Sequence, residues 1–202
     1  MQRVTFIAVV GGSGSGKTWL AERLADRLGT ATTRLRLDDF YRDLSHLTRA
    51  GRDACNFDDP AAIDWEAVRE AVEELAAGRA ARAPVYDFTS HSRRPGTQSL
   101  PPAPVVIGDG LWLLHPGWLR GRFAFSVFVD CAMEVRLERR IGRDSRERGR
   151  NEGSVRRQFE TQVEPMHRRF VEPQRAFATR CVSSPVEEPA LVGLLEALRA
   201  VI

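Results

Sequence analysis

The sequence predicts an α/β protein with a parallel β-sheet covered by helices on both faces. An apolar run at 4–10 leads into a glycine-rich loop, and a helical pattern carrying Leu20, Leu24 and Leu28 follows. Further apolar runs at 105–109 and 125–130 suit buried parallel strands. Because helical segments alternate with these strands, the connections favour parallel pairing and two helical layers.

Length and composition predict one domain, residues 1–202. The net charge of +3 is small, so charge gives little support to nucleic-acid binding. Cys55, Cys131 and Cys181 show no C-x-x-C spacing and are expected to be reduced thiols. The sequence contains no apolar run of membrane-spanning length and no room for a signal peptide, which predicts a cytoplasmic enzyme without a membrane partner.

Residues 11–18 match the phosphate-binding loop G-x-x-x-x-G-K-[ST] between a strand and a helix. Its glycines let backbone N–H groups approach an anion, and the helix N-terminus adds partial positive charge. Lys17 is the only lysine beside 29 arginines, at a position where a compact ammonium suits phosphates. Thr18 is a candidate Mg²⁺ ligand. The predicted nucleotide-binding residues are Gly11, Gly12, Ser13, Gly14, Ser15, Gly16, Lys17 and Thr18.

Two acidic residues follow a short predicted strand at 34–37, and they are expected beside the phosphate-binding loop. Asp38 suits a general base toward an acceptor hydroxyl or a group that helps to hold Mg²⁺. The alternative is that Asp38 or Asp39 caps the following turn. A third acid, Asp109, ends the strand at 105–109 and suits a metal site, or merely a strand-to-loop turn.

The middle of the chain predicts a polar, irregular segment at 48–60, a helix capped by Asp64 and a strand at 84–88. A helix carrying Val135 and Ile141 is followed by seven clustered arginines that continue into a glycine-containing loop at 147–151. This cluster predicts either a solvated face or a mobile lid over phosphates, at about 143–153. A helix at 154–170 broken near Pro165, a last strand at 180–185 and a helix at 187–201 complete the chain.

Ordered motifs across the chain resemble those of the uridine (uridine–cytidine) kinases, in the group that includes phosphoribulokinase and pantothenate kinase. The motifs are GGSGSGKT at 11–18, DDFYRDL at 38–44, NFDDP at 56–60, PVYDFTSHSR at 84–93, RDSRERGR at 143–150, and Gln158 with VEP at 163–165. The segments at 84–93 and 143–150 are more specific than the loop alone. The resemblance implies a P-loop kinase fold with a substrate-binding strand or hairpin insertion at about 84–100.

The resemblance also implies individual roles. Asp38 corresponds to the catalytic base for a nucleoside 5′-hydroxyl, near the metal, and Asp58 to the carboxylate that binds the ribose. Further implied substrate contacts are Tyr86, Phe88, His91, Arg140, Arg150 and Gln158, and implied phosphate contacts in the lid are Arg143 and Arg148. Without the resemblance, Tyr86 and His91 would be interpreted as structural residues.

Two positions depart from the family pattern. Asp109 stands where the family usually has glutamate, so direct metal ligation could become water-mediated. Asp59 stands where histidine is common, which adds negative charge beside the sugar site.

We therefore expect an ATP- or GTP-dependent kinase with Mg²⁺ that phosphorylates uridine and cytidine in pyrimidine salvage. The resemblance also implies a homo-oligomer, a tetramer. The alternatives are the same chemistry on nicotinamide riboside, pantothenate or a phosphosugar, and a non-catalytic nucleotide-binding regulator or a nucleic-acid-dependent ATPase. The arginine cluster lacks the interleaved aromatic residues typical of single-stranded nucleic-acid binding, so no nucleic-acid partner is expected.

Overall fold

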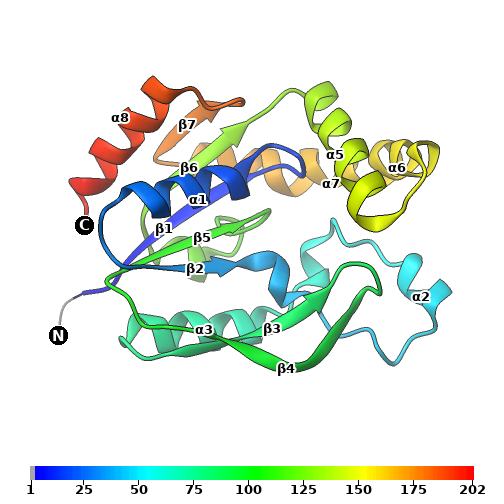
Figure 1. Cartoon of the computed structure of the whole chain (residues 1–202), viewed down its shortest axis with the longest axis horizontal. Helices are drawn as coiled ribbons and strands as arrows, with labels where there is room; N and C mark the ends of the chain where they lie inside the picture. Colours follow the sequence, from blue (N-terminus) through cyan, green and yellow to red (C-terminus); the bar gives the residue numbers. More distant parts are fainter. Residues whose placement is uncertain (1–2) are drawn as a thin grey trace.

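The centre of the molecule is a five-stranded parallel sheet in the order β2-β5-β1-β6-β7 (Figure 1). The computed structural model describes residues 3–202, apart from the side chains of Asp53 and Arg148. The strands are β1 (Thr5–Gly11), β2 (Thr32–Arg36), β5 (Val105–Gly110), β6 (Phe123–Asp130) and β7 (Arg180–Ser183). The predicted parallel sheet is confirmed.

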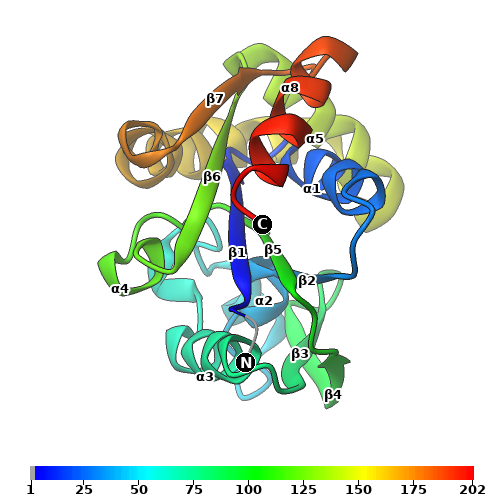
Figure 2. The same ribbon diagram turned by 90° about the vertical axis from the view of Figure 1, so that its left-hand side faces the viewer.

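Helices cover both faces of this sheet because side chains alternate along its buried strands. In β1, Ile7 and Val9 pack with the apolar stripes of α1 (Lys17–Arg27) and α8 (Glu188–Arg199). Phe6, Ala8 and Val10 point to the other face, toward α3 (Trp65–Ala76), α4 (Gly117–Arg120) and residues 159–177. Figure 2 shows α1 and α8 on one side of β1 and α4 on the other.

Two amphipathic helices form where the sequence predicts them. The Asp64 carboxylate accepts a hydrogen bond from the backbone N–H of Ala67 at 3.2 Å, which caps α3. In α8 the leucines at 191, 194, 195 and 198 are all buried. In contrast, the segment expected to be irregular contains a short helix, α2 (Arg49–Asp53), and a 3₁₀ turn (Pro60–Ala62). The Thr48 hydroxyl caps α2 by accepting from Gly51 N, a local signal that the sequence interpretation missed.

The strand predicted at 84–88 belongs to a separate antiparallel hairpin instead of the main sheet. It consists of β3 (Ala81–Asp87) and β4 (Ser92–Leu100), so the insertion expected at 84–100 begins slightly earlier. Two side chains attach this hairpin to the turn that follows β2. Gln98 Nε2 donates to the Asp39 carboxylate at 2.8 Å, and Arg93 Nε donates to the Tyr41 carbonyl at 2.8 Å.

Most of the arginine-rich region is helical, and the loop expected at 147–151 is confined to residues 149–151. Helix α5 (Met133–Arg148) continues through most of it, and α6 (Glu152–Gln158) begins almost at once. Gly149 ends α5 in the left-handed conformation with φ 62°, and its N–H donates to the Asp144 carbonyl. The Asn151 side chain then caps α6 by accepting from Ser154 N at 2.8 Å.

The helix expected at 154–170 extends further than predicted and changes its pitch along its length. After α6 come a π-helix (Phe159–Val163), α7 (Glu164–Met166), a second π-helix (His167–Val171) and a 3₁₀-helix (Glu172–Phe177). Pro165 lies inside this helical run, just after the first π-helix, so the predicted break near Pro165 takes the form of a change in helical pitch and not of an end to the helix. No helix within residues 3–202 combines the length and apolar character needed to cross a membrane.

Candidate active site

The phosphate-binding loop connects β1 to α1 and lies against the first turns of α5. Gly14 and Gly16 adopt φ values of 82° and 91°, which favour glycine. A Cβ on Gly14 would lie 2.5 Å from the Arg136 carbonyl oxygen, so no larger residue fits while α5 keeps this position. The close approach of α5 brings its arginine side chains over the loop.

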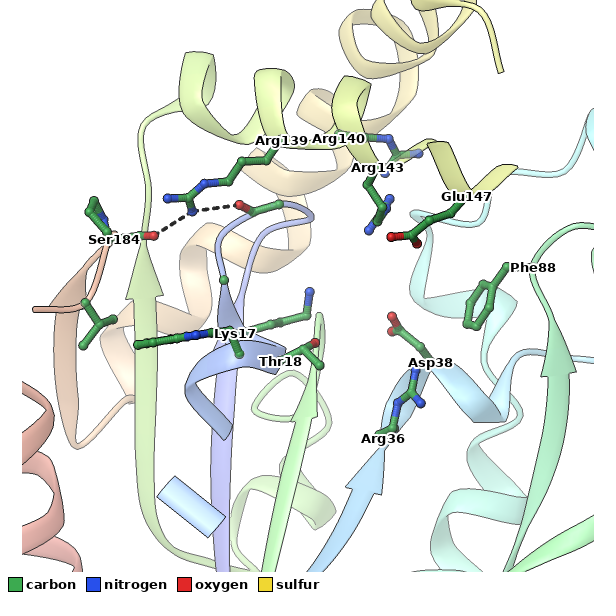
Figure 3. Close-up of a pocket in the computed structure, with 15 residues that line it drawn as sticks. Lys17, Thr18, Arg36, Asp38, Phe88, Arg139, Arg140, Arg143, Glu147 and Ser184 are labelled. Carbon is green, nitrogen blue, oxygen red and sulfur yellow. Dashed lines mark hydrogen bonds between the residues drawn. The ribbon is translucent and has the colours of Figure 1, made fainter. Parts of the chain in front are cut away.

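Two of these arginines bind the loop itself. Arg139 Nη1 donates to the Gly14 carbonyl at 3.2 Å and to Ser184 Oγ at 2.8 Å (Figure 3). Arg140 Nη1 donates to Ser13 Oγ at 2.9 Å. A third arginine, Arg136, pairs with Glu164 at 2.7 Å. The cluster is therefore partly a scaffold for the loop and not only a solvated face or a lid.

A cavity of about 700 Å³ opens in front of the loop, and we call it the donor cavity. Figure 3 shows Lys17 and Thr18 in its middle, Arg139, Arg140 and Arg143 above them, and Asp38 and Phe88 on the side away from Ser184. Its lining comprises Gly14, Gly16, Lys17, Thr18, Trp19, Arg36, Asp38, Phe88, Arg139, Arg140, Arg143, Glu147, Ser184, Pro185 and Val186. Burial lowers the pKa of Lys17, although Asp38 and Asp109 favour its charged form.

A second cavity, of about 60 Å³, adjoins the first, and we call it the acceptor cavity. Its lining comprises Ser13, Lys17, Asp38, Tyr41, Phe57, Asp58, Tyr86, Phe88, His91, Leu111, Arg140, Arg143, Arg150 and Gln158. Five residues line both cavities: Lys17, Asp38, Phe88, Arg140 and Arg143. One ammonium, one carboxylate, two guanidinium groups and an aromatic ring thus lie where the two cavities meet.

At this junction, Asp38 Oδ1 is buried, and no described residue donates a hydrogen bond to it. A buried carboxylate oxygen without a donor is costly. An acceptor hydroxyl or a metal-bound water would satisfy it. This oxygen is therefore the strongest geometric sign that Asp38 contacts a ligand.

The polar side of the acceptor cavity is built around Asp58, which is 7% exposed. Burial raises the pKa of the Asp58 carboxyl, and the guanidinium of Arg140, 3.8 Å away, opposes that rise. Gln158 Oε1 accepts from Arg140 at 3.1 Å and from Arg150 at 2.6 Å. The carboxylate can accept from vicinal hydroxyls on a ligand.

The apolar side of the acceptor cavity consists of stacked rings. His91 lies parallel to Phe57 with ring centroids 4.5 Å apart, and its backbone has a positive φ of 52°. Tyr86 meets Phe88 edge to face with ring centroids 5.1 Å apart, and it is tilted against Tyr41 with centroids 5.2 Å apart. These rings give the acceptor cavity aromatic surfaces, which can pack against a planar ligand.

A buried acid joins the arginines of the two cavities. Asp144 has a fully buried side chain and accepts from Arg143 Nε at 2.8 Å. Its carboxylate also lies 3.6 Å from Arg140 and 3.8 Å from Arg150. Asp144 therefore helps to fix the positions of Arg140 and Arg143, which line both cavities, and of Arg150, which lines the acceptor cavity.

Asp109 lies behind Thr18 and outside the lining of both cavities. It accepts from the Thr18 hydroxyl at 2.8 Å and pairs with Arg34 at 2.5 Å. The donor set around Lys17 fits Mg²⁺, because the Thr18 hydroxyl and the Asp38 carboxylate face the donor cavity and Asp109 can orient the hydroxyl. Among the described residues, no three His, Cys, Asp or Glu side chains form a cluster that could bind a metal by itself.

The acidic neighbours of Asp38 and Asp58 have local roles. The Asp59 carboxylate accepts from Ala61 N at 2.8 Å and caps the 3₁₀ turn, so it does not line the acceptor cavity. The negative charge of Asp59, which was expected beside the sugar site, is therefore engaged by a backbone N–H group. Asp39 is buried and accepts from Gln98, and burial raises its pKa.

Most of the predicted site residues gather around the two cavities, with five exceptions. Gly11, Gly12 and Ser15 form the loop but do not line either cavity, Asp109 lies behind it, and the Arg148 side chain is outside the described residues. The sequence interpretation missed several lining residues. They are Trp19, Arg36, Tyr41, Phe57, Leu111, Arg139, Glu147, Ser184, Pro185 and Val186. Tyr41 and Phe57 lie inside the motifs at 38–44 and 56–60, and Trp19 directly follows Thr18. Closeness in sequence to predicted site residues could therefore have identified these three.

A parallel sheet, a phosphate-binding loop with its lysine, and a carboxylate beside a second cavity define a P-loop kinase. The model of the Phosphoribulokinase / Uridine kinase family matches residues 6–185, and the chain belongs to that family. It is 39% identical over 198 residues to a uridine kinase of Deinococcus deserti, covering 97% of this chain and 96% of the relative. A uridine kinase of Staphylococcus haemolyticus is 37% identical, covering 88% and 86%.

The fold is also that of a solved phosphoribulokinase from Rhodobacter spheroides. The TM-score is 0.68 at 14% identity, covering 91% of this chain and 71% of the other. Kinases of this P-loop family use a nucleotide and Mg²⁺. The predicted family, kinase class and fold are confirmed.

Proposed function

We propose that this protein transfers the γ-phosphoryl group of ATP or GTP to the 5′-hydroxyl of uridine, and also of cytidine. The full-length similarity to proteins named uridine kinase supports this substrate. The observation that carries the proposal is the meeting of Lys17, Asp38 and Arg143 at the junction of a large and a small cavity. A donor phosphate and an acceptor hydroxyl bound in these cavities would meet there.

The chemistry of the residues that line the acceptor cavity, and not its volume of about 60 Å³, suits a pyrimidine ribonucleoside. Asp58 would accept hydrogen bonds from the ribose hydroxyls, with Arg140, Arg150 and Gln158 holding that side of the cavity. Tyr86 and His91 would bond the edge of the base, and Phe88 would form a wall beside it. A site with so many buried polar groups rejects ligands that leave those groups unpaired.

Asp38 would act as the base. Its carboxylate accepts the proton of the 5′-hydroxyl as the new O–P bond forms and the bond from the γ-phosphorus to the bridging oxygen breaks, which releases the nucleoside diphosphate. The oxygen of Asp38 that lacks a donor supports this role. Positioning the hydroxyl in line with the γ-phosphorus is the other part of its work.

Charge on the transferred group would be held by Lys17, by Arg143 and by the N–H groups of the loop. Mg²⁺ would neutralise phosphate charge, with Thr18 and Asp38 near it and Asp109 orienting the Thr18 hydroxyl. A phosphate contact by Arg148, a lid at 143–153, a homo-oligomer and a cytoplasmic location stay predictions.

The proposal is tested by a panel of acceptors with labelled ATP and labelled GTP. We expect phosphorylated product from uridine and cytidine. Much lower turnover is expected with nicotinamide riboside, pantothenate and phosphosugars. Preference for one of those acceptors would contradict the proposal, and so would nucleotide hydrolysis without any acceptor product.

A further inference from the structure

Trp19 presents an aromatic surface to the donor cavity. It lies in the first turn of α1, directly after Thr18, and lines the cavity with 44% of its surface exposed. Its neighbours Leu20 and Ala21 are buried against the sheet. An indole is among the largest apolar surfaces available to a protein, and here it is left open on the wall of a cavity.

The residues on either side of Lys17 and Thr18 show which end of the donor cavity lies away from Asp38. Asp38 and Phe88 lie on one side of Lys17 and Thr18, and Ser184 lies on the other (Figure 3). A Cβ on Gly16 would lie 3.6 Å from Ser184 Oγ, so the loop that carries Ser184, Pro185 and Val186 packs beside the start of α1.

Trp19 lines the donor cavity together with Pro185 and Val186, and none of the three lines the acceptor cavity. The phosphates of a donor would lie at Lys17, with its γ-phosphate toward Asp38. The rest of the nucleotide must then extend away from Asp38, toward the Ser184 side.

We propose that Trp19 is the stacking surface for the base of the phosphate donor. This inference rests on the proposed function, in which the donor is a purine nucleoside triphosphate. The indole offers a flat face of the size of a purine, and the apolar side chains of Pro185 and Val186 line the same cavity. The Arg23 guanidinium lies 5.8 Å from the indole centroid and restrains its orientation.

Stacking reads the face of a base and not its hydrogen-bonding edge. Trp19 is therefore expected to contribute to the binding of ATP and of GTP alike, and it would not discriminate between them. Because Trp19 is remote from the acceptor cavity, its contribution belongs to the donor alone.

The test compares a ligand that has a base with one that lacks it. Trp19→Ala and Trp19→Phe are titrated calorimetrically with Mg·ATP and with magnesium tripolyphosphate, which can occupy the loop but has nothing to stack. Phe177→Ala is the matched control, because Phe177 is an exposed ring with an arginine over it and lies outside both cavities.

We expect Trp19→Ala to weaken Mg·ATP binding by about 5- to 100-fold. Tripolyphosphate affinity and the KM for uridine should stay unchanged, Trp19→Phe should recover most of the loss, and Phe177→Ala should have no effect. In the wild type, Mg·ATP should quench tryptophan fluorescence and tripolyphosphate should not. That quench should disappear in Trp19→Phe.

Equal weakening of ATP and tripolyphosphate by Trp19→Ala would overturn the inference, because it would mean that Trp19 only supports the loop. Unchanged ATP affinity would also overturn it. In both cases phosphorylation of uridine by the wild type would leave the proposed function standing. Failure of the wild type to bind either purine triphosphate would overturn both.

Discussion

Arg34 and Asp109 form a 2.5 Å ion pair between the neighbouring strands β2 and β5. The second carboxylate oxygen of Asp109 accepts from the Thr18 hydroxyl at 2.8 Å. Both oxygens of this buried acid are therefore engaged by side chains. Asp109, which is one methylene shorter than the glutamate usual at this position, thus orients the Thr18 hydroxyl. Its own charge is balanced by Arg34 of β2.

Replacing Arg34 should destabilise the protein through Asp109. In Arg34→Met the buried carboxylate loses its counter-charge, so we expect the free energy of unfolding to fall by about 1–3 kcal/mol. Urea unfolding measures this change. Arg82→Met is the control, because Arg82 is exposed on β3 and should change stability by less than about 0.5 kcal/mol. Equal effects of the two substitutions would contradict a structural role for the pair.

Asp38→Asn should remove the base and leave the donor cavity intact. Turnover is expected to fall by roughly 10²–10⁴-fold, the usual contribution of a positioned base. The affinity for Mg·ATP should change little, because Lys17 and the loop are untouched. Rapid-quench kinetics and calorimetry measure the two quantities. Turnover close to that of the wild type would remove Asp38 from this role.

Asp58→Asn should weaken the recognition of ribose. We expect kcat/KM for uridine to fall by about 10- to 100-fold, the cost of losing hydrogen bonds to a charged group. The preference for uridine over 2′-deoxyuridine should shrink, because an amide binds the 2′-hydroxyl less strongly than a carboxylate does. Steady-state kinetics with both nucleosides measure this preference. An unchanged preference would mean that Asp58 does not bind the ribose 2′-hydroxyl.

Asp144→Asn should affect both cavities at once. With one charge fewer among Arg140, Arg143 and Arg150, we expect lower turnover together with a higher KM for uridine, and a loss of roughly 1–3 kcal/mol in stability. Ser145→Ala, at the exposed neighbouring position of α5, is the control. A stability loss with unchanged kinetic constants would mean that Asp144 only holds the helix.

Asp39→Asn should stabilise the protein in a pH-dependent way. Burial raises the pKa of Asp39 in the folded state, so its contribution to stability is fully present below the unfolded pKa and is lost as pH rises through the folded one. Asparagine keeps an acceptor for Gln98 and carries no charge. The melting temperature of the variant should therefore exceed that of the wild type near pH 8, and this gain should disappear near pH 3. A gain that persists at low pH would contradict the mechanism.

The sequence predicts the parallel sheet well, because 105–109 and 125–130 are apolar strands. The phosphate-binding loop at 11–18 also indicates a strand before it and a helix after it. Asp38 and Lys17 are predictable for the same reason, since the carboxyl ends of parallel strands meet at one edge.

Other features depend on contacts between distant residues and could not be predicted from local patterns. Some arginines of α5 bind the phosphate-binding loop and others line the cavities, because α5 packs on the loop at Gly14. No local sequence pattern predicts that contact. The engagement of Asp109 by Arg34 depends on strand order. The loop expected at 147–151 is shorter than predicted, because α5 continues to Arg148 before Gly149 terminates it and α6 begins at Glu152.

The β3–β4 hairpin forms a sheet of its own, and it carries Tyr86 at the acceptor cavity, with Phe88 and His91 in the turn between its strands. The residues proposed to take part in phosphoryl transfer lie elsewhere: Lys17 begins α1, Asp38 follows β2 and Arg143 lies on α5. The proposed contacts to the base and the proposed residues of phosphoryl transfer therefore lie on different structural elements. Exchange of residues 81–100 between relatives should therefore change the preferred acceptor and leave the central sheet and the phosphate-binding loop undisturbed.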